Sequence, residues 1–142
     1  MKLTFIVVLT LICIFLLVGN FTPSLLRIIP TRSLELKINS LSTDKQVYHS
    51  NEPMNISLDV YASKNTQADF KVFGIKDRRG NYRLDQFEKR NLTSGINAIY
   101  YSYTTPSCYG CAGIDPGKHQ ITTLVSCENI TINKTIEIQI ES

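Results

Sequence analysis

The sequence predicts an all-β fold: an antiparallel β-sandwich of about seven strands, preceded by one N-terminal hydrophobic helix. Three observations predict it. From residue 33 onward aliphatic side chains alternate with polar ones. Turn-forming residues separate the alternating segments, and an uncharged apolar run occupies residues 3–18. The 142 residues therefore divide into a signal peptide or N-terminal membrane anchor over 1–19, a linker over 20–32 and one sandwich over 33–142.

The N-terminal run reads LTFIVVLTLICIFLLV and lies between Lys2 and Gly19. As a helix it would span about 24 Å, less than the roughly 30 Å of a bilayer's hydrocarbon core. Leu17-Val18-Gly19 also matches poorly the small-residue pattern that signal peptidase cleaves. A cleaved signal peptide and an uncleaved anchor both stay open. Both alternatives place the β-domain outside the cytoplasm. An uncleaved anchor makes the protein single-pass in the cell membrane through residues 3–18, and a cleaved signal peptide makes it secreted.

Five N-x-S/T sequons favour the same address, because they are candidate glycosylation acceptors on an exported surface. They begin at Asn20, Asn55, Asn91, Asn129 and Asn133. Chance also generates such triplets in a chain rich in Asn, Ser and Thr. The prediction of export therefore rests on the apolar run together with the sequons.

Six segments carry the every-other-residue pattern that places aliphatic side chains on one face of a strand. Pro53 stands at the start of the second segment, where its missing N–H does no harm. Two such faces packed together form a core about 10 Å thick. The inward positions, segment by segment, are Leu34, Leu36 and Ile38; Met54, Ile56, Leu58 and Val60; Phe70 and Val72; Ile99, Tyr101 and Tyr103; Ile121, Thr123 and Val125; and Ile136, Ile138 and Ile140. Tyr101 and Tyr103 suit a binding patch equally well, because their rings carry a polar tip.

The stretches between these segments have turn chemistry. Turns are predicted at residues 50–53, 79–81, 93–95, 115–117 and 127–129. Residues 76–90, KDRRGNYRLDQFEKR, hold six bases and three acids. We interpret them as a solvated hairpin or an edge strand whose charges prevent further pairing. Contact with an anionic glycan or headgroup is the alternative use of this charge.

The segments PMNISLDVYAS, LTSGINAIYYSY and GIDPGKHQITTLV, followed by NKTIEIQI, carry a family resemblance. Over about 110 residues the chain resembles the immunoglobulin-like modules of microbial cell-surface proteins, including the cell-adhesion-related CARDB type. His119 stands where that family usually has the Tyr of a P-G-x-Y-x-I segment. The resemblance implies an Ig-like sandwich that serves adhesion, spacing or binding at a surface, and it implies no catalytic residues.

Three cysteines lie late in the chain. In an oxidising compartment Cys108 and Cys111 can close a small disulfide ring that stiffens a long loop. Cys127 is then left over, as an unpaired thiol or as the site of an intermolecular bridge in a disulfide-linked dimer. Cys13, inside the apolar run, is interpreted as a small hydrophobe.

Two other interpretations of these thiols, a zinc site and a redox site, have less support than a structural disulfide. A zinc site would need Cys108, Cys111, His119 and Cys127, yet His119 and Cys127 would be about 26 Å apart along one strand. We therefore expect no metal and no cofactor. A thiol-disulfide redox protein using the CxxC of Cys108 and Cys111 is the alternative function. Turn residues, however, follow this motif where such enzymes place a helix.

The charge distribution argues against nucleic-acid binding. Residues 1–32 hold three of the 15 bases and none of the 12 acids, which leaves twelve of each in residues 33–142. A neutral body lacks the clustered basic face that phosphate neutralisation requires.

A surface patch of Tyr100, Tyr109, Arg78 and Arg79 is the candidate binding site for an unknown surface protein or glycan. No Ser-His-Asp set or acidic pair is readable, so we expect a binding or structural module and not an enzyme.

Overall fold

The computed structural model describes residues 33–108 and 113–142, which belong to one compact unit, Ser33–Ser142. The predicted N-terminal helix, the linker, Asn20, Tyr109 and Cys111 lie outside the described residues. Within those residues every regular element is a strand. No helix there has the length and apolar character of a membrane span.

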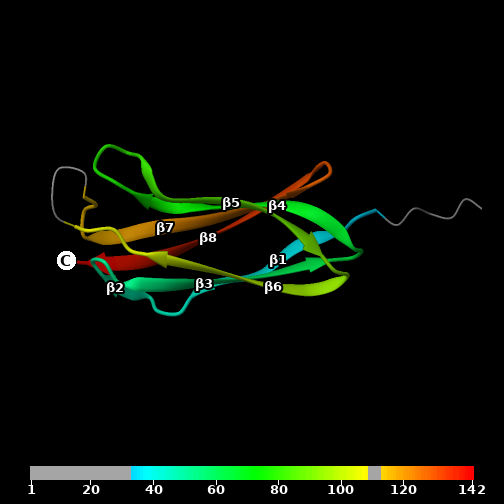
Figure 1. Ribbon diagram of the computed structural model, residues 1–142, viewed down its shortest axis with the longest axis horizontal. Helices are drawn as coiled ribbons and strands as arrows, with labels where there is room; N and C mark the ends of the chain where they lie inside the picture. Colours follow the sequence, from blue (N-terminus) through cyan, green and yellow to red (C-terminus); the bar gives the residue numbers. More distant parts are fainter. Residues whose placement is uncertain (1–32, 109–112) are drawn as a thin grey trace, which may run out of the picture. The chain divides into compact units, whose positions relative to one another are not determined.

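Eight strands form two sheets packed face to face (Figure 1). One sheet has the order β1-β3-β6 and the other β2-β8-β7-β4-β5. This confirms the all-β fold with two sheets. The bounds are β1 Leu36–Thr43, β2 Val47–His49, β3 Pro53–Ala62, β4 Thr66–Lys76, β5 Tyr82–Leu92, β6 Gly95–Thr104, β7 Gly117–Cys127 and β8 Ile130–Glu141.

Two details of the predicted fold are corrected. The strand number is eight where about seven were expected, because β2 and β5 lack a readable alternation. The sandwich is also not wholly antiparallel, since β2 pairs with β8 in parallel, with Tyr48 opposite Ile140. β5 is one edge strand of the larger sheet, and β2 is the other. The edge-strand interpretation of residues 76–90 is therefore confirmed.

The core lies between the two sheets and follows the predicted alternation. Met54, Ile56, Leu58 and Val60 of β3 are buried, as are Phe70 and Val72 of β4 and Ile121 and Val125 of β7. Tyr101 is buried and Tyr103 packs against the core, so both belong to it. In β1 the register shifts between Ile38 and Ser40. After this bulge the odd-numbered side chain of Leu41 points into the core, where the even-numbered positions did so before it. Leu41 is therefore buried, while Ile38 is only half-buried.

The connections gather at the two ends of the sandwich. At one end, which we call the Cys108 end, lie the β2–β3 turn, the β4–β5 turn, the segment before β7 and the C-terminus (Figure 1). Three hydrogen bonds hold these connections together: Ser50 N to the Glu141 oxygen at 3.1 Å, Arg78 N to the Gly113 oxygen at 3.3 Å and Cys108 N to Ser50 Oγ at 3.0 Å. The β7–β8 turn, with Cys127 beside it, lies at the other end.

Candidate functional site

A distortion in β4 lies close to the Cys108 end. Pairing of β4 with β7 stops at Gly74, opposite Ile121. A Cβ on Gly74 would lie 2.1 Å from the Gln120 backbone oxygen, so only glycine fits this close approach. The next residue, Ile75, is buried and has φ 51°, a left-handed conformation that is strained for a β-branched side chain. Such strain costs about 1–3 kcal/mol and clusters at functional sites.

A pocket of about 250 Å³ opens at this distortion, on the outer face of the larger sheet. In β7 Ile121 points into the core, so its neighbours Gln120 and Thr122 point outward and line the pocket. The complete lining is Phe73, Gly74, Ile75, Lys76, Tyr82, Lys118, His119, Gln120 and Thr122. We call this set the sheet-face pocket.

Two aromatic rings line one side of the sheet-face pocket, and each has a lysine ammonium group near its face. The rings of Phe73 and Tyr82 meet edge to face, with centroids 5.0 Å apart and planes at 75°. Lys76 Nζ lies 5.1 Å from the centroid of Tyr82, and Lys71 Nζ lies 5.6 Å from that of Phe73. Both distances are within the range of cation–π attraction, so the rings hold the two ammonium groups in place.

The charges of the pocket do not cancel. Lys118 Nζ pairs with Glu137 at 2.7 Å, and this hydrogen bond raises the pKa of Lys118. Lys71 pairs with Asp85 at 3.1 Å. Lys76 has no ion-pair partner among the residues that the structure describes. His119 donates from Nε2 to the Asp115 backbone oxygen at 2.8 Å. One uncompensated cation therefore faces a pocket with aromatic, amide and hydroxyl walls.

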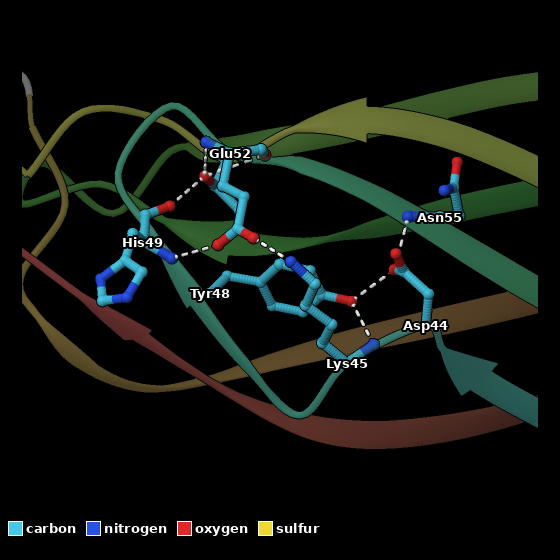
Figure 2. Close-up of polar contacts among 7 residues, drawn as sticks. Asp44, Lys45, Tyr48, His49, Glu52 and Asn55 are labelled. Atoms are coloured by element: carbon cyan, nitrogen blue, oxygen red, sulfur yellow. Dashed lines mark hydrogen bonds and ion pairs between the residues drawn. The ribbon is translucent and has the colours of Figure 1, made fainter.

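A polar cluster at the β1–β2–β3 connection is the other concentration of charge (Figure 2). The Tyr48 hydroxyl donates to Asp44 Oδ1 at 2.6 Å and accepts from Lys45 N at 2.9 Å. Asn55 N also donates to Asp44 Oδ1, at 2.8 Å. The hydrogen bond from Tyr48, followed by that from Asn55, lowers the pKa of Asp44, while burial raises the pKa of Tyr48.

The second half of this cluster joins Glu52 to the end of β6. Lys45 Nζ forms an ion pair with Glu52, whose other oxygen accepts from His49 N at 2.7 Å (Figure 2). The buried Thr105 hydroxyl accepts from Glu52 N at 2.8 Å and donates to the His49 oxygen at 2.6 Å. Because these groups bind one another and the backbone, the cluster holds the connection in place.

The two described thiols lie far apart. Cys108 is 5% exposed beside the Glu141 oxygen, whereas Cys127 is 4% exposed at the other end of the sandwich, with Sγ 3.0 Å from Thr66 Oγ1. No disulfide joins either of them to another described residue. With Cys111 outside the described residues, the Cys108–Cys111 bridge stays a prediction, as does a dimer through Cys127. The described residues contain no group of three His, Cys, Asp or Glu side chains that could hold a metal ion.

The predicted binding patch is divided by the fold. Tyr100 is 68% exposed on β6 of the smaller sheet. Arg78 and Arg79 are exposed in the β4–β5 turn of the larger sheet, where Arg78 Nε pairs with Asp115 at 2.7 Å. The candidate glycosylation sites Asn55, Asn91, Asn129 and Asn133 are all exposed.

The sheet-face pocket was missed by the sequence analysis. Its residues come from three strands, of which β7 lies more than 35 positions after the lining residues of β4 and β5. The outward alternation of Lys118, Gln120 and Thr122 also resembles that of any solvated strand. The available signal was the basic segment 76–90, which holds Lys76 and Tyr82 and for which contact with an anionic glycan was the alternative interpretation.

Neither a protein-family model nor a curated protein matches the chain. Solved structures do. The DNA glycosylase AlkC from Pseudomonas fluorescens, bound to DNA containing an abasic site analog, matches with TM-score 0.54 and 18% identity over 76% of this chain and 31% of that one. A β-glucosidase from Erythrobacter marinus matches with TM-score 0.54 and 12% identity over 76% of this chain and 16% of that one. A CARDB domain from Pyrococcus furiosus, in complex with di-metal ions, matches with TM-score 0.49 and 13% identity over 77% of this chain and 86% of that one.

These matches correct one expectation. The prediction that the chain is not an enzyme is overturned, because the same fold occurs inside a DNA glycosylase and inside a β-glucosidase. This chain spans less than a third of AlkC and a smaller part of the β-glucosidase. At such identities the likeness shows the fold alone and establishes no activity for this chain. Membership of the CARDB type stays a prediction, while its coarser content, an all-β fold of two sheets, is confirmed.

Proposed function

We propose that the chain is an immunoglobulin-like binding module that works outside the cytoplasm and captures a protein or glycan of a cell surface. The observation that carries this proposal is the sheet-face pocket. It combines two aromatic rings, a lysine without an ion-pair partner and outward amide and hydroxyl groups. Binding sites typically combine apolar walls with a few convergent polar groups in this way.

The proposed location rests on the sequence. The uncharged run of residues 3–18 anchors the module in the membrane as a single span, or is removed when the module is secreted. The exposure of Asn55, Asn91, Asn129 and Asn133 is what glycan attachment requires. The redox alternative gains no comparable support, because Cys108 is buried and no helix is present among the described residues to activate it.

Protease accessibility tests the location. Intact cells that express the full chain with a C-terminal tag are treated with protease, and the tag is followed by immunoblotting together with a cytoplasmic marker. We expect loss of the tag from intact cells, or its recovery from the medium, while the marker is spared. A tag that is cleaved only after lysis would overturn the proposed location.

A binding assay tests the capture of a surface ligand. The purified full chain, in mild detergent, is mixed with washed envelopes from cells that lack the gene, and bound protein is measured after sedimentation. We expect saturable binding that the double variant Lys76→Met, Tyr82→Leu weakens. Sedimentation no greater than that of an unrelated protein of the same charge would contradict a binding module.

A further inference from the structure

The proposed function leaves the ligand of the sheet-face pocket open, and the chemistry of its walls narrows the choice. Resting on that function, we infer that the pocket binds one acidic sugar residue, with the sugar's carboxylate on Lys76. Three properties of the described residues lead to this ligand class: the net charge facing the pocket, its size and its aromatic walls.

The charge selects a single anionic group. Of the two lysines that line the pocket, Lys118 is already paired with Glu137, so its charge is compensated. Lys76 contacts the Tyr82 ring and has no ion-pair partner among the described residues. A ligand with one carboxylate completes this pairing through a charge-assisted hydrogen bond. A strongly polyanionic group would meet the carboxylate of Glu137.

The size selects one ring. A volume of about 250 Å³ is slightly below the roughly 300–1,000 Å³ of pockets that hold drug-sized ligands. It suits a single pyranose unit, with the rest of a chain running over the open sheet.

The walls select a sugar over a simple anion. Tyr82 is 44% exposed and Phe73 is half-buried, so both rings offer carbon surface to the pocket without lying in the core. The C–H faces of a pyranose pack on such surfaces, and its hydroxyl groups meet the outward side chains of Gln120 and Thr122. Inorganic phosphate would pair with the ammonium group but would make no contact with the aromatic rings.

The glycine and the strained isoleucine locate the pocket on a rigid part of the sheet. Gly74 lets β7 approach within contact of β4, and Ile75 is locked by burial in its left-handed conformation. Lys76 follows directly, so its backbone position is fixed by these two residues. A preorganised cation loses little freedom when a ligand binds, which favours affinity.

Calorimetric titration of the full chain in mild detergent tests the inference. The probes are trimers of galacturonate and of β-1,4-glucuronate, their methyl esters, the two free monosaccharides and inorganic phosphate. We expect at least one acidic trimer to bind about tenfold or more tightly than its ester, because esterification removes the charge-assisted bond. Equal binding of acid and ester, no binding of either acid, or competition by phosphate at the same concentration as the trimer would overturn the inference.

The monosaccharides distinguish the source of the ligand. A monosaccharide as tight as its trimer indicates a free acidic sugar, and a tighter trimer indicates a polysaccharide chain; both support an acidic sugar residue in the pocket.

Variants assign the binding to the pocket. Lys76→Met should weaken acid binding about tenfold and leave the ester unchanged, so that the acid-to-ester ratio falls to about one. Tyr82→Leu should weaken acid and ester alike. Lys37→Met, on β1 of the smaller sheet, is the matched control and should bind as the unaltered protein does. A Lys76→Met protein with an unchanged thermal midpoint and unchanged acid binding would overturn the assignment.

This inference and the proposed function fail in different ways. If envelopes capture the unaltered chain and Lys76→Met equally, the module binds a surface by another face. If the chain is cytoplasmic and yet binds the acidic trimer, the location is wrong and the pocket assignment stands.

Discussion

Gly74→Ala would test the close approach of β4 to β7 that forms the pocket floor. The new Cβ would lie 2.1 Å from the Gln120 oxygen and 2.9 Å from the Ile121 Cα. Both atoms belong to the backbone, so no side-chain rotation relieves the overlap. Overpacking of this kind costs about 1–3 kcal/mol, and we expect the upper half of that range. For a domain of this size the thermal midpoint should fall by about 8–20 °C.

The assay is thermal and urea unfolding followed by circular dichroism. The matched control is Gly80→Ala in the β4–β5 turn, where no atom lies within 4 Å of the added Cβ and only the φ of +84° opposes the change. The control should lose about 1 kcal/mol. The effect of alanine on the unfolded chain has the opposite sign, since at positions whose folded backbone accepts alanine the replacement of glycine stabilises a protein by about 0.4–1 kcal/mol. A loss of stability must therefore come from the folded state. A Gly74→Ala protein that melts at or above the unaltered midpoint would refute the packing argument.

Three further perturbations test the rest of the structure. Thr105→Val leaves the Glu52 N–H and the His49 oxygen without their hydroxyl partner, so it should cost about 1–3 kcal/mol by urea unfolding, whereas Thr105→Ser should cost less. Asp44 has a pKa below its ordinary value of 3.8, so its contribution is complete above that value and is lost as the pH falls through the lower folded pKa; Asp44→Asn should flatten the acid limb of the stability profile. Cys127, buried against Thr66, should resist iodoacetamide in the folded protein and react in urea, as mass spectrometry of its peptide will show.

Each of these three has an outcome that counts against it. Equal stability of Thr105→Val and Thr105→Ser would mean that the hydroxyl does not hold the β2–β3 turn. An Asp44→Asn protein with the unaltered acid limb would remove Asp44 from the pH dependence. Rapid alkylation of Cys127 in the native protein would place this thiol on the surface, where it could form the predicted intermolecular bridge.

The sequence predicted the core well because burial on one face imposes a period of two. Ile56, Leu58 and Val60 are inward in the pattern and buried in the structure. The exception is β1, where the bulge after Ile38 shifts the register. A bulge inserts one residue without leaving a composition signal, so Leu41 was missed as a core residue.

The edge strands were harder to predict for a related reason. In β5 only Leu84 and Leu92 are buried, so polar residues occupy most positions and the alternation is diluted. β2 has three residues, too few for a period to be read, and only Tyr48 of the three is buried. The charge of residues 76–90 identified the edge correctly even though the strand itself was not assigned.

The candidate site lay beyond the sequence because it depends on proximity between strands. Lys76, Tyr82 and Gln120 meet only through the pairing of β4 with β5 and β7. A single sequence does not show which strands pair or which residues lie opposite one another. The same limit divided the predicted patch, because Tyr100 lies on β6 of the smaller sheet and Arg79 in the β4–β5 turn of the larger one. The left-handed Ile75 was unreadable as well, because nothing in its residue type favours that conformation.

The most direct test of a binding site on the larger sheet is an amide NMR titration of the 16.1 kDa chain in detergent micelles with the acidic trimer that binds best. We predict that the largest shift changes fall on residues 73–76 and 118–122 and saturate at the calorimetric affinity. Largest changes around Tyr100 on β6, or in the polar cluster of Asp44 and Glu52, would contradict this site.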